Sequence, residues 1–387
     1  MTTLFVIICL AFISLGLPDS LLGAIWPSAQ IELGAALSTA GIISTVVCAG
    51  TIISSLFSAR IINKFKTAPV TIISVLMTAV ALVGYSYTPS VLWIFIFAIP
   101  LGLGAGSVDA ALNNYVALHY QAKHMSWLHC FWGVGATLGP VIISLLSKSG
   151  WRTGVRTISL IQFVLVIVLI LSLPLWKRQE SQAIHTTESS VFISNRDALK
   201  IPGLKYALLS FFCYCGVELT TGLWSASYLV GTKGISPSTA AAWVSLYYGG
   251  ITIGRFVLGF VLGRTSSKTM IRLGTAVCAL GTVILALPLP DVYSLLALLL
   301  IGAGAAPIYP CLIHETPARF GKAASQSAIG LQMAAAYIGS TVLPPVFGFM
   351  AQYISITLLP YYLLTIIALM FIAGEQINRF IKQRTIV

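Results

Sequence analysis

The stretch Leu101–Tyr120, LGLGAGSVDAALNNYVALHY, places an acid and an amide inside an apolar run. Its three alternating glycines would let a second helix backbone approach closely, as small residues do at helix contacts in lipid. Asp109 follows them, and a carboxylate at that depth costs several kcal/mol unless it faces a cavity, has a partner or carries a proton. Asn113 lies four residues further on and therefore on the same helical face. This stripe predicts a polar path through a membrane.

The composition of the whole chain is that of an integral membrane protein. Of its 387 residues, 57% are hydrophobic and only 8% are charged, which is too apolar a balance for an aqueous globule. Apolar runs of about 20 residues, the length that crosses a bilayer core, recur along the chain. The sequence is apolar from Leu4 without a basic region before it, so we expect a first span and not a removed signal peptide.

Hydropathy and helix-breaking residues predict an all-α membrane protein with twelve transmembrane helices in two six-helix bundles. The predicted spans are 3–27, 38–59, 68–87, 90–118, 126–147, 155–175, 203–230, 238–262, 269–287, 291–314, 324–350 and 355–378. A polar interval separates the sixth span from the seventh. The expected domains are therefore an N-terminal bundle over 1–175, a cytoplasmic loop over 176–202 and a C-terminal bundle over 203–387.

The two predicted bundles resemble each other at an offset near 200 residues. Residues 50–53, GTII, correspond to 250–253, GITI, and the glycines of 102–106 correspond to those of 302–304. Glycine is common in membrane helices, so each correspondence alone is weak. Together with further correspondences between the first and seventh and between the fifth and eleventh spans, four in the same order at nearly one offset indicate parallel repeats related by an axis along the membrane normal.

The net charge of +12 is explained by where the charges lie. If both termini are cytoplasmic, 17 of the 22 Lys and Arg residues fall in cytoplasmic segments. This is the positive-inside pattern, so the charge indicates topology and not a nucleic-acid partner. We expect a multi-pass protein of the cell (plasma or inner) membrane with cytoplasmic termini. Arg255 lies inside a predicted span, and we expect it to pair with a neighbour or extend to the interface.

Sequence motifs of enzymes and ATP-driven pumps are absent. The chain contains no H-E-x-x-H, G-x-S-x-G or Walker loop, and its seven cysteines show neither C-x-x-C nor metal-ligand spacing. We therefore expect no enzymatic activity, no metal site and no cofactor.

Three acids lie inside predicted spans: Asp19, Asp109 and Glu218. Intramembrane acids are candidates for carrying a proton through the bilayer. Asp19 follows Pro18, which breaks the helical hydrogen-bond ladder, so it could instead satisfy freed backbone groups. Asp109 could instead bond Asn113 in a helix contact. We predict Asp19 and Asp109 as proton-coupling residues.

Other polar and aromatic side chains in the spans are candidates for binding a solute. Glu218 and Trp224 share one predicted helix and combine a carboxylate with an aromatic face, which suits a neutral polyhydroxylated ligand. His129 could equally sit at the membrane interface, and Gln332 could equally bond two helices together. The predicted substrate-binding set is Asn113, His129, Trp132, Glu218, Trp224 and Gln332.

These residues resemble the major facilitator superfamily and, within it, the fucose-galactose-glucose proton symporter branch, often called fucose permease-like. In helix 4 that branch has glycines, an acid and then A-x-N-x-Y; residues 109–115, DAALNNY, fit with Asn114 where proline is usual. Helix 5 departs from the branch, since His129 and Trp132 replace an amide pair before the turn GATLGP at 135–140. The resemblance implies proton-coupled sugar uptake by alternating access. We expect a sugar, a proton and the lipid bilayer as partners of a monomer.

Two other functions stay open. A proton-linked exporter of drugs or metabolites is indicated by Gly135-x-x-x-Gly139-Pro140, which resembles the antiporter signature of helix 5. Ile143 and Ser144 stand where that signature has a second glycine pair. A membrane receptor or scaffold is the third function, but the short loops and the lack of a soluble output domain disfavour it. Sodium stays open as the coupling ion.

Overall fold

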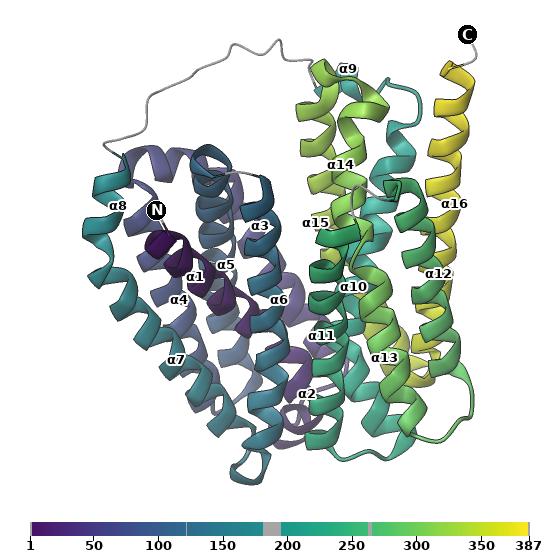
Figure 1. Cartoon of the computed structure of the whole chain (residues 1–387). Helices are drawn as coiled ribbons and strands as arrows, with labels where there is room; N and C mark the ends of the chain where they lie inside the picture. The colour runs from purple at the N-terminus through teal and green to yellow at the C-terminus, as the bar shows by residue number, and fades with distance from the viewer. Residues whose placement is uncertain (1, 121, 181–194, 262–264, 386–387) are drawn as a thin grey trace.

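The computed structural model describes residues 2–120, 122–180, 195–261 and 265–385 (Figure 1). Within these ranges, every secondary-structure element longer than one residue is a helix, which confirms the all-α prediction. The first half comprises α1 (Thr2–Asp19), α2 (Leu21–Glu32), α3 (Thr39–Phe65), α4 (Thr67–Tyr87), α5 (Val91–His119), α6 (Ala122–Leu145), η1 (Ser147–Ser149), α7 (Trp151–Leu171) and α8 (Leu173–Glu180).

The second half repeats this plan. It comprises α9 (Asn195–Ala198), α10 (Leu204–Lys233), α11 (Pro237–Val261), α12 (Ser267–Ala286), α13 (Val292–Ala305), α14 (Ile308–Phe320), α15 (Lys322–Tyr353), η2 (Ile356–Leu358) and α16 (Leu359–Thr385). Figure 1 shows the two halves as adjacent groups of long, roughly upright helices.

Eleven helical stretches of the described chain are long and apolar enough to cross a membrane. Helix α11 is not among them, although it occupies the place of the eighth predicted span and has 25 residues. Its tyrosines Tyr247 and Tyr248 and the charge of Arg255 lower its hydropathy. Because α11 packs lengthwise between α6 and α13, both apolar helices, it completes the set of twelve.

Close backbone contacts explain the glycines of the quoted stretch. A Cβ atom added to Gly102 would lie 2.2 Å from the Val47 carbonyl oxygen, and one on Gly106 would lie 2.3 Å from that of Thr51, so α5 lies directly on α3. In the second half, a Cβ on Gly302 would lie 2.0 Å from the Tyr247 carbonyl oxygen, where α13 lies on α11. The repeated glycines therefore perform the same packing task in both halves.

Helix α1 ends at Asp19, and a new helix, α2, begins two residues later. Pro18 cannot donate the backbone hydrogen bond that would continue the ladder. A second break separates α13 from α14 at Pro307. Such breaks are where membrane helices expose polar groups near mid-depth.

The predicted central loop begins inside a helix. Helix α8 continues to Glu180, because Trp176 is 2% exposed and packs on Tyr115 with 4.8 Å between ring centroids. Residues 181–194 of the predicted loop lie outside the described residues. The helical part of the first half thus extends to Glu180, and the domain limits stay predictions.

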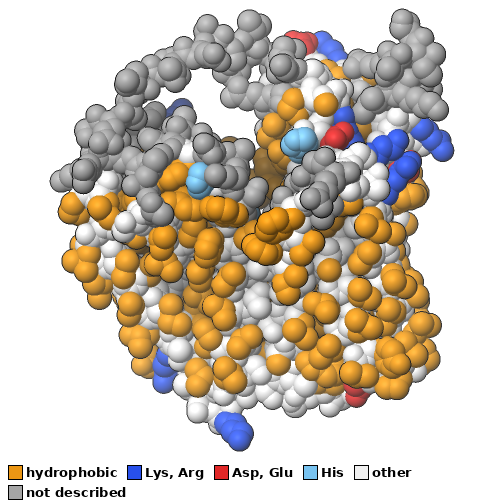
Figure 2. Space-filling view, viewed as in Figure 1, with side chains coloured by type: hydrophobic (Ala, Val, Ile, Leu, Met, Phe, Trp, Pro, Cys, Tyr) orange, Lys and Arg blue, Asp and Glu red, His pale blue; other side chains and the backbone are white. Residues whose placement is uncertain are grey.

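The two halves meet tightly at the end away from the chain termini. A Cβ on Gly23 of α2 would lie 2.3 Å from the Gly222 carbonyl oxygen of α10, and one on Gly41 of α3 would lie 2.6 Å from Pro345 Cα of α15. Toward the termini, α3 and α15 diverge (Figure 1), and Figure 2 shows a shaded recess between the halves at that end. The molecule is therefore closed at one end and open at the other.

Candidate functional site

The three intramembrane acids come from both halves and gather near the centre. They stand on α1, α5 and α10, and Asp19 interacts electrostatically with both Asp109 and Glu218. The Asp19 side chain is exposed, whereas Asp109 and Glu218 are half-buried. An exposed carboxylate on a helix surrounded by other helices lines a water-accessible space between them. Asp19 therefore faces the opening between the halves, and the other two acids lie near it.

Asp19 is held by an indole. The Nε1–H group of Trp132 on α6 donates to Asp19 Oδ2 over 2.7 Å. Two glycines make this contact possible, because a Cβ on Gly16 would lie 2.1 Å from the Trp132 carbonyl oxygen and one on Gly135 would lie 2.0 Å from that of Ile13. The close packing of α1 on α6 therefore positions Trp132 beside the acid.

Glu218 is paired with an arginine of the next helix. Arg255 Nη2 of α11 lies 3.2 Å from Glu218 Oε1, with the two side chains 10% and 16% exposed. The same nitrogen donates to the hydroxyl of Tyr214 over 3.4 Å. Tyr247 donates its hydroxyl to the backbone carbonyl of Glu218 over 3.0 Å. The prediction that Arg255 pairs with a neighbour is confirmed.

Arg255 also joins the two halves. Its guanidinium carbon lies 5.4 Å from the centroid of the Trp132 ring, a cation–π contact worth about 0.5–2 kcal/mol. A continuous series of contacts thus runs from Asp19 through Trp132 and Arg255 to Glu218. We call these four residues the cross-bundle chain. A change of charge at Asp19 or at Glu218 therefore occurs beside a side chain that contacts the other half.

Asp109 and Asn113 form the stripe predicted from the sequence. Asn113 Nδ2 donates to Asp109 Oδ1 over 2.8 Å, one turn along α5. Asp109 also interacts electrostatically with Tyr309 of α14 and Tyr337 of α15, both in the second half. The stripe therefore faces the other half and adds a second carboxylate to the opening.

His129 lies on the same helix as Trp132. Its ring packs edge-on against Phe12 with 5.8 Å between centroids, and it interacts electrostatically with Arg255. The half-buried imidazole thus lies beside the cross-bundle chain. Within the described residues, no group of three or more His, Cys, Asp or Glu side chains is arranged to hold a metal ion.

Trp224 and Gln332 lie apart from these groups in this conformation. Trp224 is fully buried and donates from Nε1 to the Pro344 carbonyl oxygen over 2.8 Å. Gln332 is 1% exposed and accepts from the Thr316 hydroxyl over 3.0 Å. Both bonds join neighbouring helices of the second half, so neither side chain contributes to the open surface.

Sequence reasoning missed the tyrosines of the site: Tyr214, Tyr247, Tyr309 and Tyr337. Tyr214 and Tyr247 form hydrogen bonds with Arg255 and with the backbone of Glu218, and Tyr309 and Tyr337 interact electrostatically with Asp109. It also missed Ser225 in a row of hydroxyls on α10. Those of Thr221 and Ser225 are buried with no hydrogen-bond partner among the described residues, three and seven positions beyond Glu218 and hence on its helical face. That spacing from an intramembrane acid was the available signal.

Known proteins of similar sequence span most of this chain. Bypass of stop codon protein 6 of Saccharomyces cerevisiae is 24% identical over 97% of this chain and 83% of its own length. The cis,cis-muconate transport protein of Acinetobacter baylyi is 24% identical over 90% of this chain and 89% of its own. The glucose/mannose transporter GlcP of Bacillus subtilis is 24% identical over 54% of this chain and 53% of its own.

Solved structures share the fold. A bacterial homolog of the human lysosomal transporter Spinster, in an inward-facing and unoccupied conformation, superposes with a TM-score of 0.75 at 11% identity, covering 98% of both chains. A D-xylose-proton symporter superposes with a TM-score of 0.71 at 14% identity, covering 96% of this chain and 97% of its own. The family pattern of the Major Facilitator Superfamily matches residues 5–317 and 207–377. The protein is accordingly a multi-pass membrane transporter of the Major Facilitator Superfamily and not an enzyme.

Proposed function

We propose that this transporter is a proton-coupled symporter of a neutral polyhydroxylated solute, such as a sugar, working by alternating access. The observation that carries the proposal is the cross-bundle chain, which connects the exposed carboxylate of Asp19 to the Arg255–Glu218 pair of the other half. Loading of a proton or a solute there acts on contacts between the halves, which is what coupled transport requires.

The charge balance of the site favours a neutral solute over an anion. Three acids, Asp19, Asp109 and Glu218, face one described guanidinium, that of Arg255, which is already paired. Excess negative charge repels a dicarboxylate such as muconate, the solute named for one relative, and leaves acceptor oxygens for the hydroxyls of a sugar, the solute class named for another. Trp132 adds an aromatic face against which a sugar ring can pack.

Protonation would make reorientation possible. Closing the open end buries Asp19 and Asp109, and burying an unpaired carboxylate costs several kcal/mol. A proton taken up on the side of higher proton concentration removes that charge, so the loaded carrier can reorient, and the proton leaves on the other side. Asn113, His129, Trp132 and Glu218 would bind the solute near these acids. Trp224 and Gln332 would reach it only after the second half rearranges.

The proposed family branch, oligomeric state, membrane and topology rest on the sequence. We place the transporter in the fucose permease-like branch on the helix 4 residues 109–115, and we propose a monomer in the cell (inner) membrane with both termini cytoplasmic from the positive-inside pattern. With that topology, the open end described above faces the cytoplasm.

Uptake into proteoliposomes tests the proposal. A panel of labelled sugars, followed by the best one with and without an inward proton gradient, should show accumulation only with the gradient. Asp109→Asn should abolish uphill accumulation and spare some exchange, because a permanently neutral group can still reorient. Asp291→Asn, an exposed acid at the closed end, is the matched control and should accumulate normally. Full accumulation by Asp109→Asn would remove this acid from the mechanism.

The exporter alternative has a specific test. The motif that suggested it, Gly135-x-x-x-Gly139, packs α6 onto α1, since Cβ atoms there would meet the backbone of Ile13 and Leu17. This packing role accounts for both glycines without antiport. Extrusion of dyes by cells that express the protein, without any sugar-evoked alkalinisation of the medium, would favour export over the proposed symport.

A further inference from the structure

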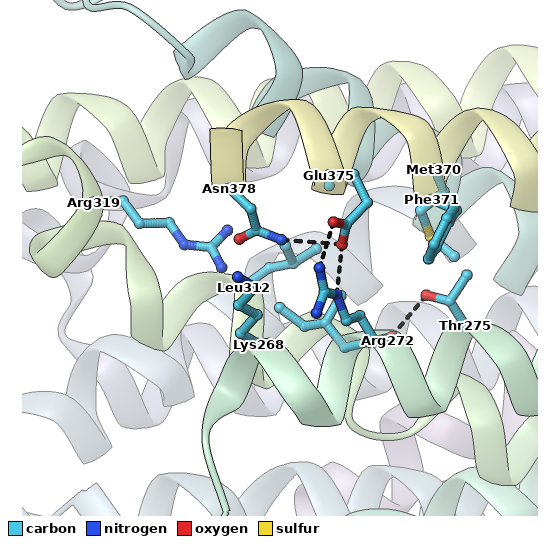
Figure 3. Close-up of a pocket in the computed structure, with 11 residues that line it drawn as sticks. Lys268, Arg272, Thr275, Leu312, Arg319, Met370, Phe371, Glu375 and Asn378 are labelled. Carbon is cyan, nitrogen blue, oxygen red and sulfur yellow. Dashed lines mark hydrogen bonds and ion pairs between the residues drawn. The ribbon is translucent and has the colours of Figure 1, made fainter. Parts of the chain in front are cut away.

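A pocket lies between α12, α14 and α16, at the end of the second half that carries the C-terminus (Figure 3). It holds about 310 Å³ including its open mouth. Three cationic side chains, Lys268, Arg272 and Arg319, line it together with one acid, Glu375. The pocket is remote from the cross-bundle chain and has no part in the transport mechanism above.

The carboxylate of Glu375 already has hydrogen-bond partners on both of its oxygens. Arg272 binds both Glu375 oxygens, at 2.7 and 2.5 Å, and Asn378 donates to the same carboxylate over 3.1 Å. Lys268 interacts electrostatically with Glu375 but forms no ion pair within the described part of the chain. The positive charge in the pocket therefore exceeds the negative charge.

Lys268 is placed where its own helix does not stabilise it. Lys268 and Arg272 are four residues apart on α12 and share a face, and Lys268 lies in the first turn, where the helix dipole is positive. Arg319 enters from α14 with its side chain only 6% exposed, and its Nε pairs with Glu315 of the same helix over 3.2 Å. Figure 3 shows the Arg319 guanidinium and the Lys268 amine both directed into the pocket. Such a cluster attracts an anion.

The walls of the pocket identify the source of the anion. Below the charged groups the lining is apolar, with Ile271, Leu312, Met370 and Phe371. Phe371 is 46% exposed and adjoins Ile372 at 54%, on a face of α16 that is apolar enough to contact lipid tails. A charged end above an apolar wall matches a lipid with an anionic headgroup, whereas a soluble phosphate compound would leave the wall unused.

We propose that this pocket binds the phosphate group of an anionic phospholipid from the leaflet next to the chain termini. Lys268 and the terminal nitrogens of Arg319 would hold the phosphate oxygens, and the acyl chains would follow Phe371 down α16. Asn378 would orient the headgroup through its carbonyl oxygen.

The test is a binding titration of the full-length protein in mild detergent, followed by native mass spectrometry. Phosphatidylglycerol is the probe, phosphatidylcholine is the zwitterionic comparison and glycerol 3-phosphate is the soluble one. Phosphatidylglycerol should bind saturably and most tightly. Lys268→Gln should weaken it about fivefold, the loss expected for one surface cation. The matched control is Lys64→Gln. Lys64 is an exposed lysine in the last turn of α3, in the other half but at the same end of the molecule, and this variant should bind the lipid normally.

A second variant predicts the opposite sign. Glu375→Gln frees Arg272 and removes the competing carboxylate, so phosphatidylglycerol should bind more tightly while the melting temperature falls through loss of the Arg272 pair. Equal affinities of the wild type and Lys268→Gln, or equal binding of phosphatidylcholine, would overturn the proposal. Displacement of the lipid by equimolar glycerol 3-phosphate would overturn it too, in favour of a soluble phosphate ligand.

Discussion

Trp132 contacts a carboxylate of its own half through its N–H group and a guanidinium of the other half through its ring. The two contacts can be separated. Trp132→Phe keeps the ring over Arg255 and removes the donor to Asp19, a bond to a charged group worth about 1.5–3 kcal/mol. We expect proton-driven accumulation to fall by roughly tenfold or more, with solute exchange largely retained.

The control for this prediction is Trp176→Phe. It removes an indole donor whose acceptor, Ser172, lies between α7 and α8, in the same half and remote from the site. Proteoliposome accumulation and exchange, measured for both variants, decide the matter. If Trp132→Phe accumulates as well as Trp176→Phe, the indole N–H has no part in coupling.

The pair Arg255–Glu218 permits a second prediction at this scale. Removing one member of a buried ion pair leaves an uncompensated charge, which typically costs about 3–5 kcal/mol. Arg255→Gln should therefore lower the melting temperature in detergent strongly, whereas Arg255→Gln with Glu218→Gln should regain most of it. The double variant should still not transport. Recovery of transport along with stability would show that the pair serves only the fold.

What the sequence could predict of the site follows from the chemistry of each residue type. An acid in an apolar run is conspicuous, so Asp19, Asp109 and Glu218 can be singled out from the sequence as candidates. The partner of Arg255 is 37 residues away on another helix, and no local pattern joins the two. Tyr214 and Tyr309 were missed because tyrosine is ordinary in membrane helices, and only the fold brings them to the acids.

At the scale of elements, one face of α10 combines a close backbone contact with hydroxyls that have no partner. Gly222 meets Gly23 of α2 where the halves close, and the unpartnered hydroxyls of Thr221 and Ser225 lie on the same helical face. Buried hydroxyls without partners cost free energy unless another state hydrates them. We infer that water hydrates the hydroxyls on this face when the closed end opens.

Cysteine labelling tests the inference. On a cysteine-free background, Ser225→Cys should react slowly with an impermeant thiol reagent added at the closed end. Adding Gly23→Ala should raise that rate, because the new Cβ would lie 2.3 Å from the Gly222 carbonyl oxygen and hold the end apart. Gly231→Ala, where the nearest atom lies 3.4 Å away, is the matched control. Equal labelling with either alanine would mean that the Gly23 contact does not keep the end closed.

The elements themselves were largely predictable because span length and hydropathy are set by the bilayer. Two departures have local causes. Helix α11 is too polar to be recognised by hydropathy alone, since Tyr247, Tyr248 and Arg255 face protein and not lipid. Helix α8 follows the sixth span, α7, and continues to Glu180 because Trp176 packs against Tyr115, a contact that only the tertiary fold supplies.

At the scale of the whole molecule, alternating access requires the two halves to move against each other. Helices α6 and α11 form a major contact between them, and their Thr137 and Thr252 hydroxyl oxygens lie 3.5 Å apart. Side chains this close can be cross-linked. A disulfide between Thr137→Cys and Thr252→Cys should fix the halves in the arrangement closed away from the termini.

We expect the oxidised double variant to lose uptake, to bind solute from the open end and to regain uptake on reduction. Each single variant should transport before and after oxidation, which controls for the loss of either hydroxyl. Uptake and solute-induced thermal stabilisation, measured in both redox states, separate a trapped carrier from a damaged one. Undiminished uptake by the cross-linked protein would mean that α6 and α11 form a fixed pivot, and that the halves rock about this contact without separating there.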